Sequence, residues 1–146
     1  MFLLNYIKYK KLAYWDIICN CHNRNFLEDK LVKKFKNKLT FLTIVDIDYF
    51  KSINDSLGHI NGDKILHTLI ETISVNDNIT YICRYGGDEF IVLHNKAINF
   101  GYYNELFKSL TGATFSYGTV YKDTFDTFSD ALMDADKRLY IKKGDK

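Results

Sequence analysis

The sequence predicts a mixed α/β fold, in which helices cover the faces of one central sheet. Short runs of β-branched and aromatic residues alternate with segments of helical periodicity, and two of the strand runs are separated by only two glycines. The expected order is helix, strand, two helices, two strands, helix, strand and helix. This order is typical of a mixed sheet, because the tight hairpin is antiparallel and the intervening helices must pack on the sheet.

The composition suits a single globular domain. The chain has 146 residues, of which 47% are hydrophobic and 26% are charged, and its net charge at pH 7 is +2. A charge this small does not favour nucleic acid as a partner. Three cysteines are an odd number without a disulfide framework, which fits a reducing cytoplasm.

The first 15 residues are predicted to form a lead-in segment, either a short helix or the stump of a longer chain. Apolar and basic residues are mixed here without a clean period. No apolar run in the sequence approaches the roughly 18 residues of a membrane span. The charges follow the apolar residues 1–4 instead of preceding them, unlike those of a signal peptide. We therefore expect no membrane partner.

The first core elements are a helix over residues 24–37 and a strand over residues 40–47. Leu27, Leu31 and Phe35 recur at the spacing of one helix face. The lysines of this segment could form a nucleic-acid patch, but a solvated helix face is the favoured interpretation. The strand is a β-branched and aromatic run, as expected for a buried strand.

Two helices are expected after this strand. The first begins near Tyr49, where Asp48 can act as the N-cap. The second covers residues 63–74, which carry four aliphatic residues on one face. The glycines and asparagine of residues 58–62 are expected to separate the two helices.

Two further strands, over residues 79–85 and 88–93, are separated by Gly86 and Gly87. Both glycines can adopt positive φ without penalty, so the pair suits a two-residue hairpin loop. The remaining predicted elements are a helix, a strand and a helix, over residues 97–110, 114–121 and 130–142.

Three carboxylates lie where the predicted strands meet their turns. Asp46 lies near the C-terminal end of its strand, and Asp88 and Glu89 follow the two glycines. If the strands are neighbours, these side chains converge, and two like charges ~4 Å apart repel by about 4 kcal/mol at an effective dielectric of about 20. A divalent cation removes this repulsion, and oxygen ligands favour Mg²⁺ or Mn²⁺. The alternative is a set of solvated carboxylates at a turn.

The residues after Asp46 suggest a phosphate-binding segment. A helix that starts directly after a strand end presents free N–H groups and a positive dipole end, which attract anions. Lys51 adds a positive charge to its first turn. Beside a metal, this arrangement indicates a nucleotide triphosphate, although Lys51 in isolation would be interpreted as a surface lysine.

The segment Arg84–Phe90, RYGGDEF, resembles the signature of the GGDEF domain, whose members are diguanylate cyclases. Three further blocks match the family in the same order, at residues 46–55, 115–118 and 135–143. The resemblance runs from about residue 16 to the C-terminus. It implies one catalytic domain over residues 16–146.

The resemblance implies the palm-like fold of nucleotidyl cyclases and the condensation of two GTP into cyclic di-GMP and two pyrophosphates. Each domain of a transient homodimer would hold one GTP, with the active sites antiparallel. The implied ligands of two Mg²⁺ or Mn²⁺ ions are Asp46, the Ile47 carbonyl, Asp88 and Glu89. Asp88 or Glu89 is also the implied catalytic group that helps to deprotonate the 3′-hydroxyl.

A set of substrate-binding residues follows from the same resemblance. Those for the phosphates are Tyr49, Phe50, Lys51 and Lys143, and those for the nucleoside are Asn54, His59 and Asp63. Guanine offers two N–H donors to a carboxylate and an O6 acceptor to an amide. A site that combines Asp63 with Asn54 is therefore expected to select GTP over ATP.

Three regions depart from the family pattern. The opening block continues after Asp16 with Ile17-Ile18-Cys19-Asn20-Cys21, where the family has x-Leu-Thr-Gly-Leu near the base pocket. Asp77 and Thr80 replace the Arg-x-x-Asp of the family's product-inhibition site, so no such site is expected. The arginine that follows the last helix in the family is absent.

Two other functions stay open beside an active cyclase. One is a catalytically silent GGDEF domain that binds GTP as a regulatory or interaction module, which the altered opening block, the missing arginine and the lack of an attached dimerisation domain favour. The other is a related cyclic-dinucleotide synthase with a different product, against which Asp63 argues. The matched carboxylates and base contacts favour the diguanylate cyclase.

Overall fold

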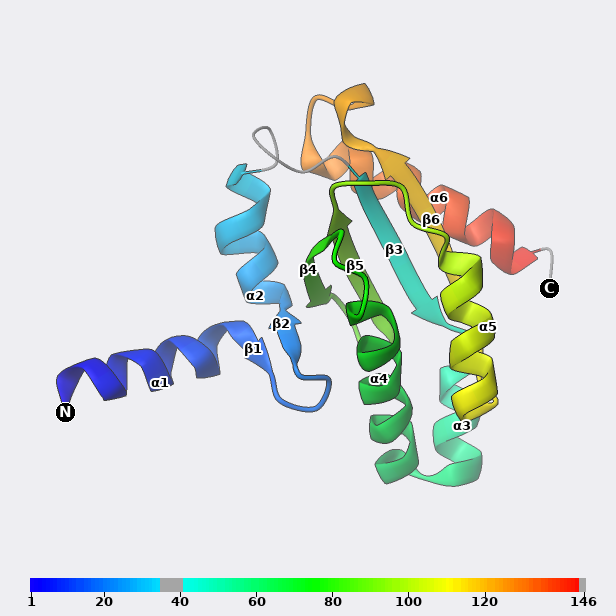
Figure 1. Cartoon of the computed structure of the whole chain (residues 1–146), viewed down its shortest axis with the longest axis horizontal. Coiled ribbons are helices and arrows are strands. Elements are labelled where there is room, and N and C mark those ends of the chain that lie inside the picture. Colours follow the sequence, from blue (N-terminus) through cyan, green and yellow to red (C-terminus); the bar gives the residue numbers. More distant parts are fainter. Residues whose placement is uncertain (35–40, 145–146) are drawn as a thin grey trace.

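Six strands form one sheet in the computed structural model, which describes residues 1–34 and 41–144 (Figure 1). They are β1 (Trp15–Asp16), β2 (Cys21–Asn23), β3 (Phe41–Ile47), β4 (Ile79–Arg84), β5 (Glu89–His94) and β6 (Phe115–Tyr121). Their order in the sheet is β1-β2-β4-β5-β3-β6. The pair β2 and β4 is parallel and the other pairs are antiparallel, which confirms the predicted mixed sheet.

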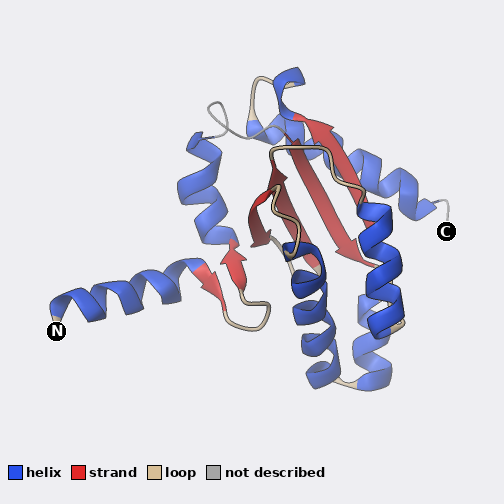
Figure 2. Ribbon diagram, in the orientation of Figure 1, coloured by secondary structure: helices blue, strands red, loops and turns tan. Residues whose placement is uncertain are grey.

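Helices cover both faces of the sheet, as predicted (Figure 2). The α-helices of the described chain are α1 (Phe2–Tyr14), α2 (Arg24–Phe26), α3 (Phe50–Leu57), α4 (His59–Ser74), α5 (Phe100–Thr111) and α6 (Phe128–Gly144). The described chain also contains a short π-helix, η1 (Leu27–Leu31), and two short 3₁₀-helices, η2 (Val32–Lys34) and η3 (Lys122–Thr124). Helices α4 and α5 lie on one face of the sheet and α6 lies on the other (Figure 1).

The core consists of two hydrophobic clusters, one on each face of the sheet. Val45 and Ile47 of β3 join the cluster under α4 and α5, whereas Leu42 and Ile44 join the cluster under α6. Successive side chains of a strand point to opposite faces, so a strand buried on both sides reads as an unbroken apolar run. This is why the unbroken apolar runs of β3 and its neighbour β5 predict buried strands.

The start of α3 differs from the prediction, because Asp48 does not cap this helix. Its carboxylate accepts hydrogen bonds from Thr114 Oγ1 at 2.5 Å and Ser116 Oγ at 2.7 Å, which lie at the start of β6. Tyr49 occupies the N-cap position instead, in the left-handed conformation (φ 55°, ψ 30°). The next helix, α4, begins at His59 and not at residue 63.

The loop between β4 and β5 is longer than predicted. Strand β4 ends at Arg84, and the backbone amides of Tyr85 and Gly86 both donate to the Glu89 carbonyl, at 2.8 and 3.2 Å. Neither Gly86 nor Gly87 has a positive φ, so the predicted two-residue turn is wrong. A loop of four residues relaxes the twist constraint that favours positive φ in two-residue hairpins.

The N-terminal region contains a lead-in helix, α1, and two short strands that were not predicted. The predicted helix over residues 24–37 is present as α2, η1 and η2. Residues 35–37 of this predicted helix, and residue 40 of the predicted strand, lie outside the described residues.

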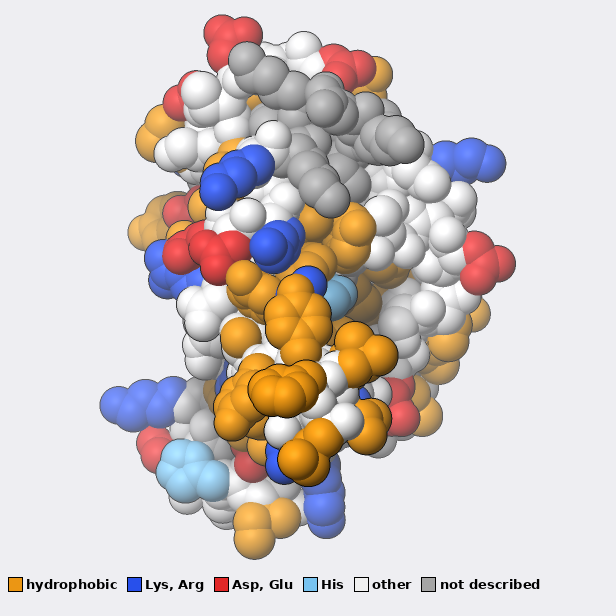
Figure 3. All heavy atoms as spheres, turned by 90° about the vertical axis from the view of Figure 1, so that its left-hand side faces the viewer, with side chains coloured by type: hydrophobic (Ala, Val, Ile, Leu, Met, Phe, Trp, Pro, Cys, Tyr) orange, Lys and Arg blue, Asp and Glu red, His pale blue; other side chains and the backbone are white. Residues whose placement is uncertain are grey.

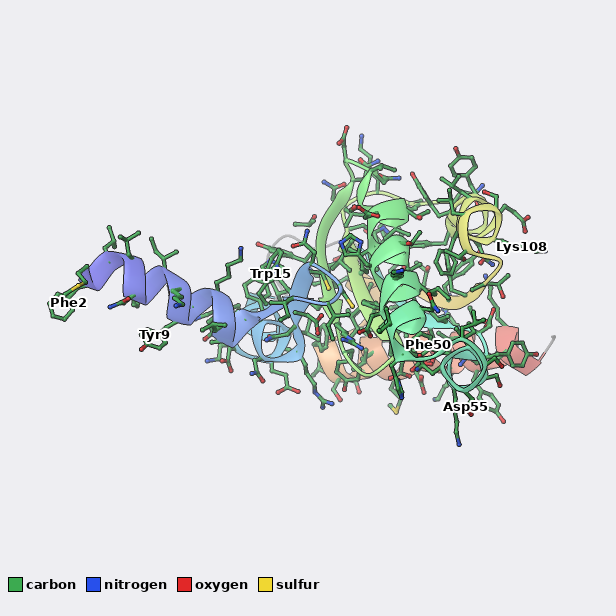
Figure 4. All side chains as sticks on the ribbon, turned by 90° about the horizontal axis from the view of Figure 1, so that it is seen from below. Phe2, Tyr9, Trp15, Phe50, Asp55 and Lys108 are labelled. Carbon is green, nitrogen blue, oxygen red and sulfur yellow. The ribbon has the colours of Figure 1, made fainter. Side chains whose placement is uncertain are left out.

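Helix α1 extends away from the rest of the structure and has no buried residue (Figures 1 and 4). Its apolar side chains gather on the face shown in Figure 3. The most exposed of them are Phe2, Leu3, Leu4 and Tyr9. Among the described residues, no helix is long and apolar enough to cross a membrane.

A buried polar network lies at the far end of β3 and β5. His94 is fully buried, with Nε2 2.8 Å from Thr43 Oγ1 and Nδ1 2.7 Å from the Lys96 carbonyl oxygen. Its ring stacks on Phe41 and meets the edge of Phe100. Burial lowers the pKa of His94, and the bond to the Lys96 carbonyl opposes this shift without cancelling it.

We expect the fold to lose stability as the pH falls below about 6.5, the usual pKa of an unfolded-state histidine. The unfolded chain takes up a proton at His94 there, while the folded chain keeps the ring neutral, so protonation favours unfolding. Melting temperatures measured between pH 7.5 and 5.5 check this. The His94→Gln variant should show a smaller decline, and an equal decline would contradict the assignment.

Candidate active site

The predicted carboxylates come together where β3 and β5 pair. Asp46 lies directly opposite Glu89 in the antiparallel ladder, and the Ile47 amide donates to the Asp88 carbonyl at 3.2 Å. Strand alternation turns Asp46 and Glu89 to the same face of the sheet, the face covered by α6. The predicted convergence depended on β3 and β5 being neighbours, and this condition is met for Asp46 and Glu89.

The electrostatics of this site are those of crowded carboxylates. Burial raises the pKa of Asp46, and the nearby Asp88 adds to the shift, against the opposing bond from Lys143. Burial also raises the pKa of Glu89, as do Asp46, Asp88 and Asp136. Both shifts mean that the site holds negative charge at a cost to the fold, as expected where a cation or a proton is to be received.

Lys143 lies on the carboxylate cluster. Its Nζ is 2.5 Å from Asp46 Oδ1, and α6 carries it across the sheet to this position. Burial disfavours the charge of the ammonium, but the bond to Asp46 and the neighbouring Asp88 outweigh it and raise the pKa of Lys143. The family resemblance implied a phosphate contact for Lys143, and it did not predict the contact with Asp46.

The donor set fits a divalent cation that binds together with substrate oxygens. Within residues 1–34 and 41–144, no group of three or more His, Cys, Asp or Glu side chains could hold a metal ion. Mg²⁺ in phosphate-processing sites is usually bound by one or two carboxylates and by substrate phosphates. Asp46 with Glu89 or Asp88 meets that requirement, and the Ile47 carbonyl lies at the same strand end.

The predicted phosphate segment lies directly beside these carboxylates. Tyr49 is 72% exposed and holds a left-handed conformation that is uncommon for a residue with a side chain. Phe50 begins α3, and Lys51 is exposed in its first turn. Backbone strain of this kind is often kept where a site requires it.

The loop that carries Asp88 is clamped by one arginine. Arg84 donates from Nε and Nη2 to the Gly87 carbonyl, at 3.2 and 2.7 Å, and from Nη1 to Asp16 Oδ2 at 3.0 Å. Asp16 in turn accepts the Cys19 amide at 2.9 Å. These bonds outweigh burial and lower the pKa of Asp16. Both Arg84 and Asp16 belong to the matched family blocks. They are 68 residues apart in the sequence, so no local pattern could predict that they pair.

The two predicted base contacts lie together on α3 and α4. Asn54 packs against the backbone of Gly62, where an added Cβ would stand 1.8 Å from Asn54 Oδ1. This oxygen is buried and has no hydrogen-bond partner in the described chain. Asp63 follows Gly62 and lines an open hollow of about 550 Å³ together with Ile18 of the opening block. His59 lies exposed at the start of α4.

Comparison with known families supports the motif match. A family model described as "Diguanylate cyclase, GGDEF domain" matches residues 13–105. The response regulator PleD of Caulobacter vibrioides is 37% identical over 89 residues, which are 57% of this chain and 20% of PleD. The diguanylate cyclase DosC of Escherichia coli is 36% identical over 89 residues, 56% of this chain and 19% of DosC.

A third relative carries a different name. The cyclic di-GMP phosphodiesterase NbdA of Pseudomonas aeruginosa is 36% identical over 90 residues, which cover 58% of this chain and 12% of NbdA. The matched part of this chain thus spans about a fifth or less of the length of these curated relatives.

The fold is that of a solved fragment from a cyclic di-GMP complex. The coiled coil and GGDEF domain of DgcB from Caulobacter crescentus, in complex with c-di-GMP, superimposes with a TM-score of 0.81 at 21% identity. The match covers 97% of this chain and 86% of the DgcB chain. At this identity the likeness establishes the fold alone.

Proposed function

Because the chain belongs to the GGDEF domain family, we propose that it is a diguanylate cyclase, which condenses two GTP molecules into cyclic di-GMP and two pyrophosphates. The pairing of Asp46 with Glu89, beside the Asp88 loop, carries this proposal. It sets two carboxylates side by side on one sheet face, next to the exposed N-terminus of α3. The two carboxylates can bind cations, and the free N–H groups at the start of α3 can bind phosphate oxygens. This combination suits a nucleotide triphosphate with its metal ions.

Each part of the site has a role in this reaction. Asp46, Asp88, Glu89 and the Ile47 carbonyl would hold Mg²⁺ or Mn²⁺, which when bound stabilises the attacking and leaving oxygens. Glu89 has a pKa raised by burial and by its acidic neighbours, so it can accept the proton of the 3′-hydroxyl. Lys51, Lys143 and the amides near Tyr49 and Phe50 orient the phosphates.

The nucleoside is bound between α3 and α4. Asp63 accepts the N–H donors of guanine, and the carboxamide of Asn54 donates to its O6, while His59 lies near the nucleotide. Because each domain holds one GTP, the reaction requires two domains with antiparallel active sites, a transient homodimer.

Incubation of the protein with GTP and Mg²⁺ at two protein concentrations tests the proposal. We expect cyclic di-GMP, detected by mass spectrometry, to form with more than first-order dependence on protein concentration. ATP alone should give no cyclic product. GTP that binds without conversion at the higher concentration would instead identify a catalytically silent module.

That second candidate has a specific observation in its favour. Ile18, which belongs to the altered opening block, lines the same open hollow as Asp63. The altered block therefore borders the proposed base site. A module that binds GTP weakly or in an unproductive pose would show nucleotide binding without turnover.

The substitution Gly62→Ala should weaken GTP binding about tenfold, the equivalent of one lost hydrogen bond of about 1.4 kcal/mol. The added Cβ forces Asn54 Oδ1 from its place, because 1.8 Å is far below contact distance. The fold should be as stable as before, since alanine is a better helix former than glycine and the displaced group is the end of a side chain. A fluorescent GTP analogue measures the affinity, and thermal unfolding provides the control. Unchanged affinity would remove Asn54 from the base site.

A further inference from the structure

We propose that Lys143 is the resident counter-ion of Asp46: it occupies the cation position on this carboxylate while nucleotide is absent, so that a divalent metal and the nucleotide bind together. The nucleotide half of this inference rests on the proposed function. The metal half concerns the chain alone and can be tested without GTP.

The contact itself defines the role. Lys143 Nζ is 2.5 Å from Asp46 Oδ1, within a charge-assisted hydrogen bond. The side chain of Asp46 is 8% exposed, so without a cation it would be a buried and uncompensated charge in a site that also contains Asp88 and Glu89. Breaking such a pair from one side costs stability, because the remaining charge stays desolvated.

Lys143 is also able to leave. Its side chain is 38% exposed, and it lies at the second-last residue of α6 in the described chain. A lysine ammonium is a point charge on a flexible four-carbon stem, which can move between neighbouring oxygens. The ammonium can therefore transfer from the carboxylate to a phosphate without passing through an unpaired state.

A metal ion alone is at a disadvantage at this site. It must displace the ammonium from Asp46, and among the described residues no three acidic, histidine or cysteine side chains are arranged so that they could hold it by themselves. A nucleotide triphosphate changes this balance, because its oxygens supply further metal ligands and a new partner for Lys143. Metal and nucleotide thereby support each other's binding.

The adjacent residue provides a matched control. Lys142 carries the same charge on the same helix end, but its Nζ lies 3.3 Å from the centroid of the Tyr117 ring and not on the carboxylates. A general effect of reduced positive charge would be common to Lys142→Met and Lys143→Met. Displacement of a counter-ion would be specific to the second.

The test is Mn²⁺ binding without nucleotide, measured by the electron paramagnetic resonance of free Mn²⁺. We expect Lys143→Met to bind Mn²⁺ at least tenfold more tightly than the wild-type protein, and Lys142→Met to bind it within twofold of wild type. The double variant Asp46→Asn, Lys143→Met should lose the gain. Equal or weaker binding by Lys143→Met would overturn the proposal.

Folding of the variants is monitored in the same samples. Mn²⁺ should raise the melting temperature of Lys143→Met more than that of wild type, because the tighter ligand stabilises the folded state more. Lys143→Gln, which keeps a hydrogen-bond donor but no charge, repeats the comparison should the methionine variant fold poorly. It too must bind Mn²⁺ more tightly than wild type.

The experiments distinguish a failure of the counter-ion proposal from a failure of the proposed cyclase function. If GTP is not converted but Lys143→Met gains Mn²⁺ affinity, the proposed function fails and the counter-ion stands. If cyclic di-GMP is formed but the gain is absent, the reverse holds. An α,β-methylene analogue of GTP should tighten Mn²⁺ binding more in wild type than in Lys143→Met, and an equal effect would count against the transfer of Lys143 to phosphate.

Discussion

The substitution Glu89→Gln is expected to lower cyclase activity at least a hundredfold and to leave the fold as stable as the wild type, or more stable. General acid–base groups contribute roughly 10²–10⁴-fold to rates, and Glu89 is also a proposed metal ligand. The amide keeps the size of the side chain but removes its charge. Cyclic di-GMP formation and thermal unfolding at pH 7.5 measure the two effects.

The loss of activity and the unchanged or increased stability of Glu89→Gln have the same physical cause. Burial and the nearby Asp46 and Asp88 raise the pKa of Glu89, so its ionised form costs free energy in the folded state at neutral pH. The neutral amide relieves this repulsion and cannot accept a proton. Glu105→Gln, at an exposed position of α5, is the matched control and should alter neither quantity. A marked loss of stability in Glu89→Gln would show that the carboxylate is a structural partner and not a strained functional group.

The substitution Gly118→Ala is expected to destabilise the fold by about 2 kcal/mol or more, within the range for overpacked cores. Gly118 lies in β6 beneath α6, and an added Cβ would stand 2.1 Å from the Ala135 carbonyl oxygen and 2.6 Å from the Leu139 amide nitrogen. Both atoms belong to the backbone, so a side-chain rotation cannot relieve the clash and α6 must move.

Chemical denaturation measures this effect against a suitable control. Gly87→Ala introduces the same methyl group at a position with an ordinary φ and no heavy atom within 4 Å, and its stability should change by less than about 0.5 kcal/mol. Because α6 carries Lys143, Gly118→Ala should also weaken the contact with Asp46. Equal stabilities of the two variants would mean that α6 does not pack on β6 as closely as described.

The parts of the fold that could be predicted are those in which the local hydrophobic pattern is enough to identify the element. The run of residues in β3 reads as a strand because it is buried on both faces, and the convergence of Asp46 with Glu89 followed once β3 and β5 were taken as neighbours. The family blocks supported the same pairing. Local pattern and tertiary structure agree in this region.

Other features depend on partners far away in the sequence. Strand β2 has three residues, and it exists because His22 and Asn23 pair with Cys83 and Arg84 of β4. Asp48 has the residue type of a helix N-cap. Its carboxylate instead accepts hydrogen bonds from the hydroxyls of Thr114 and Ser116, which are more than 60 residues away in the sequence. Such choices are decided by tertiary contacts that outweigh local preference.

Helix α1 behaves thermodynamically as an appendage of the domain. It is tethered at its C-terminal end, where Asn23 Nδ2 donates to the Ala13 carbonyl, and none of its 13 residues is buried. Packing supplies most of the stability of helices in proteins, and α1 has little packing within the described chain. We therefore expect α1 to unfold locally, and its amide protons to exchange faster than those of the sheet. Any surface that covers Phe2 and Tyr9 would shift this local equilibrium towards the helix.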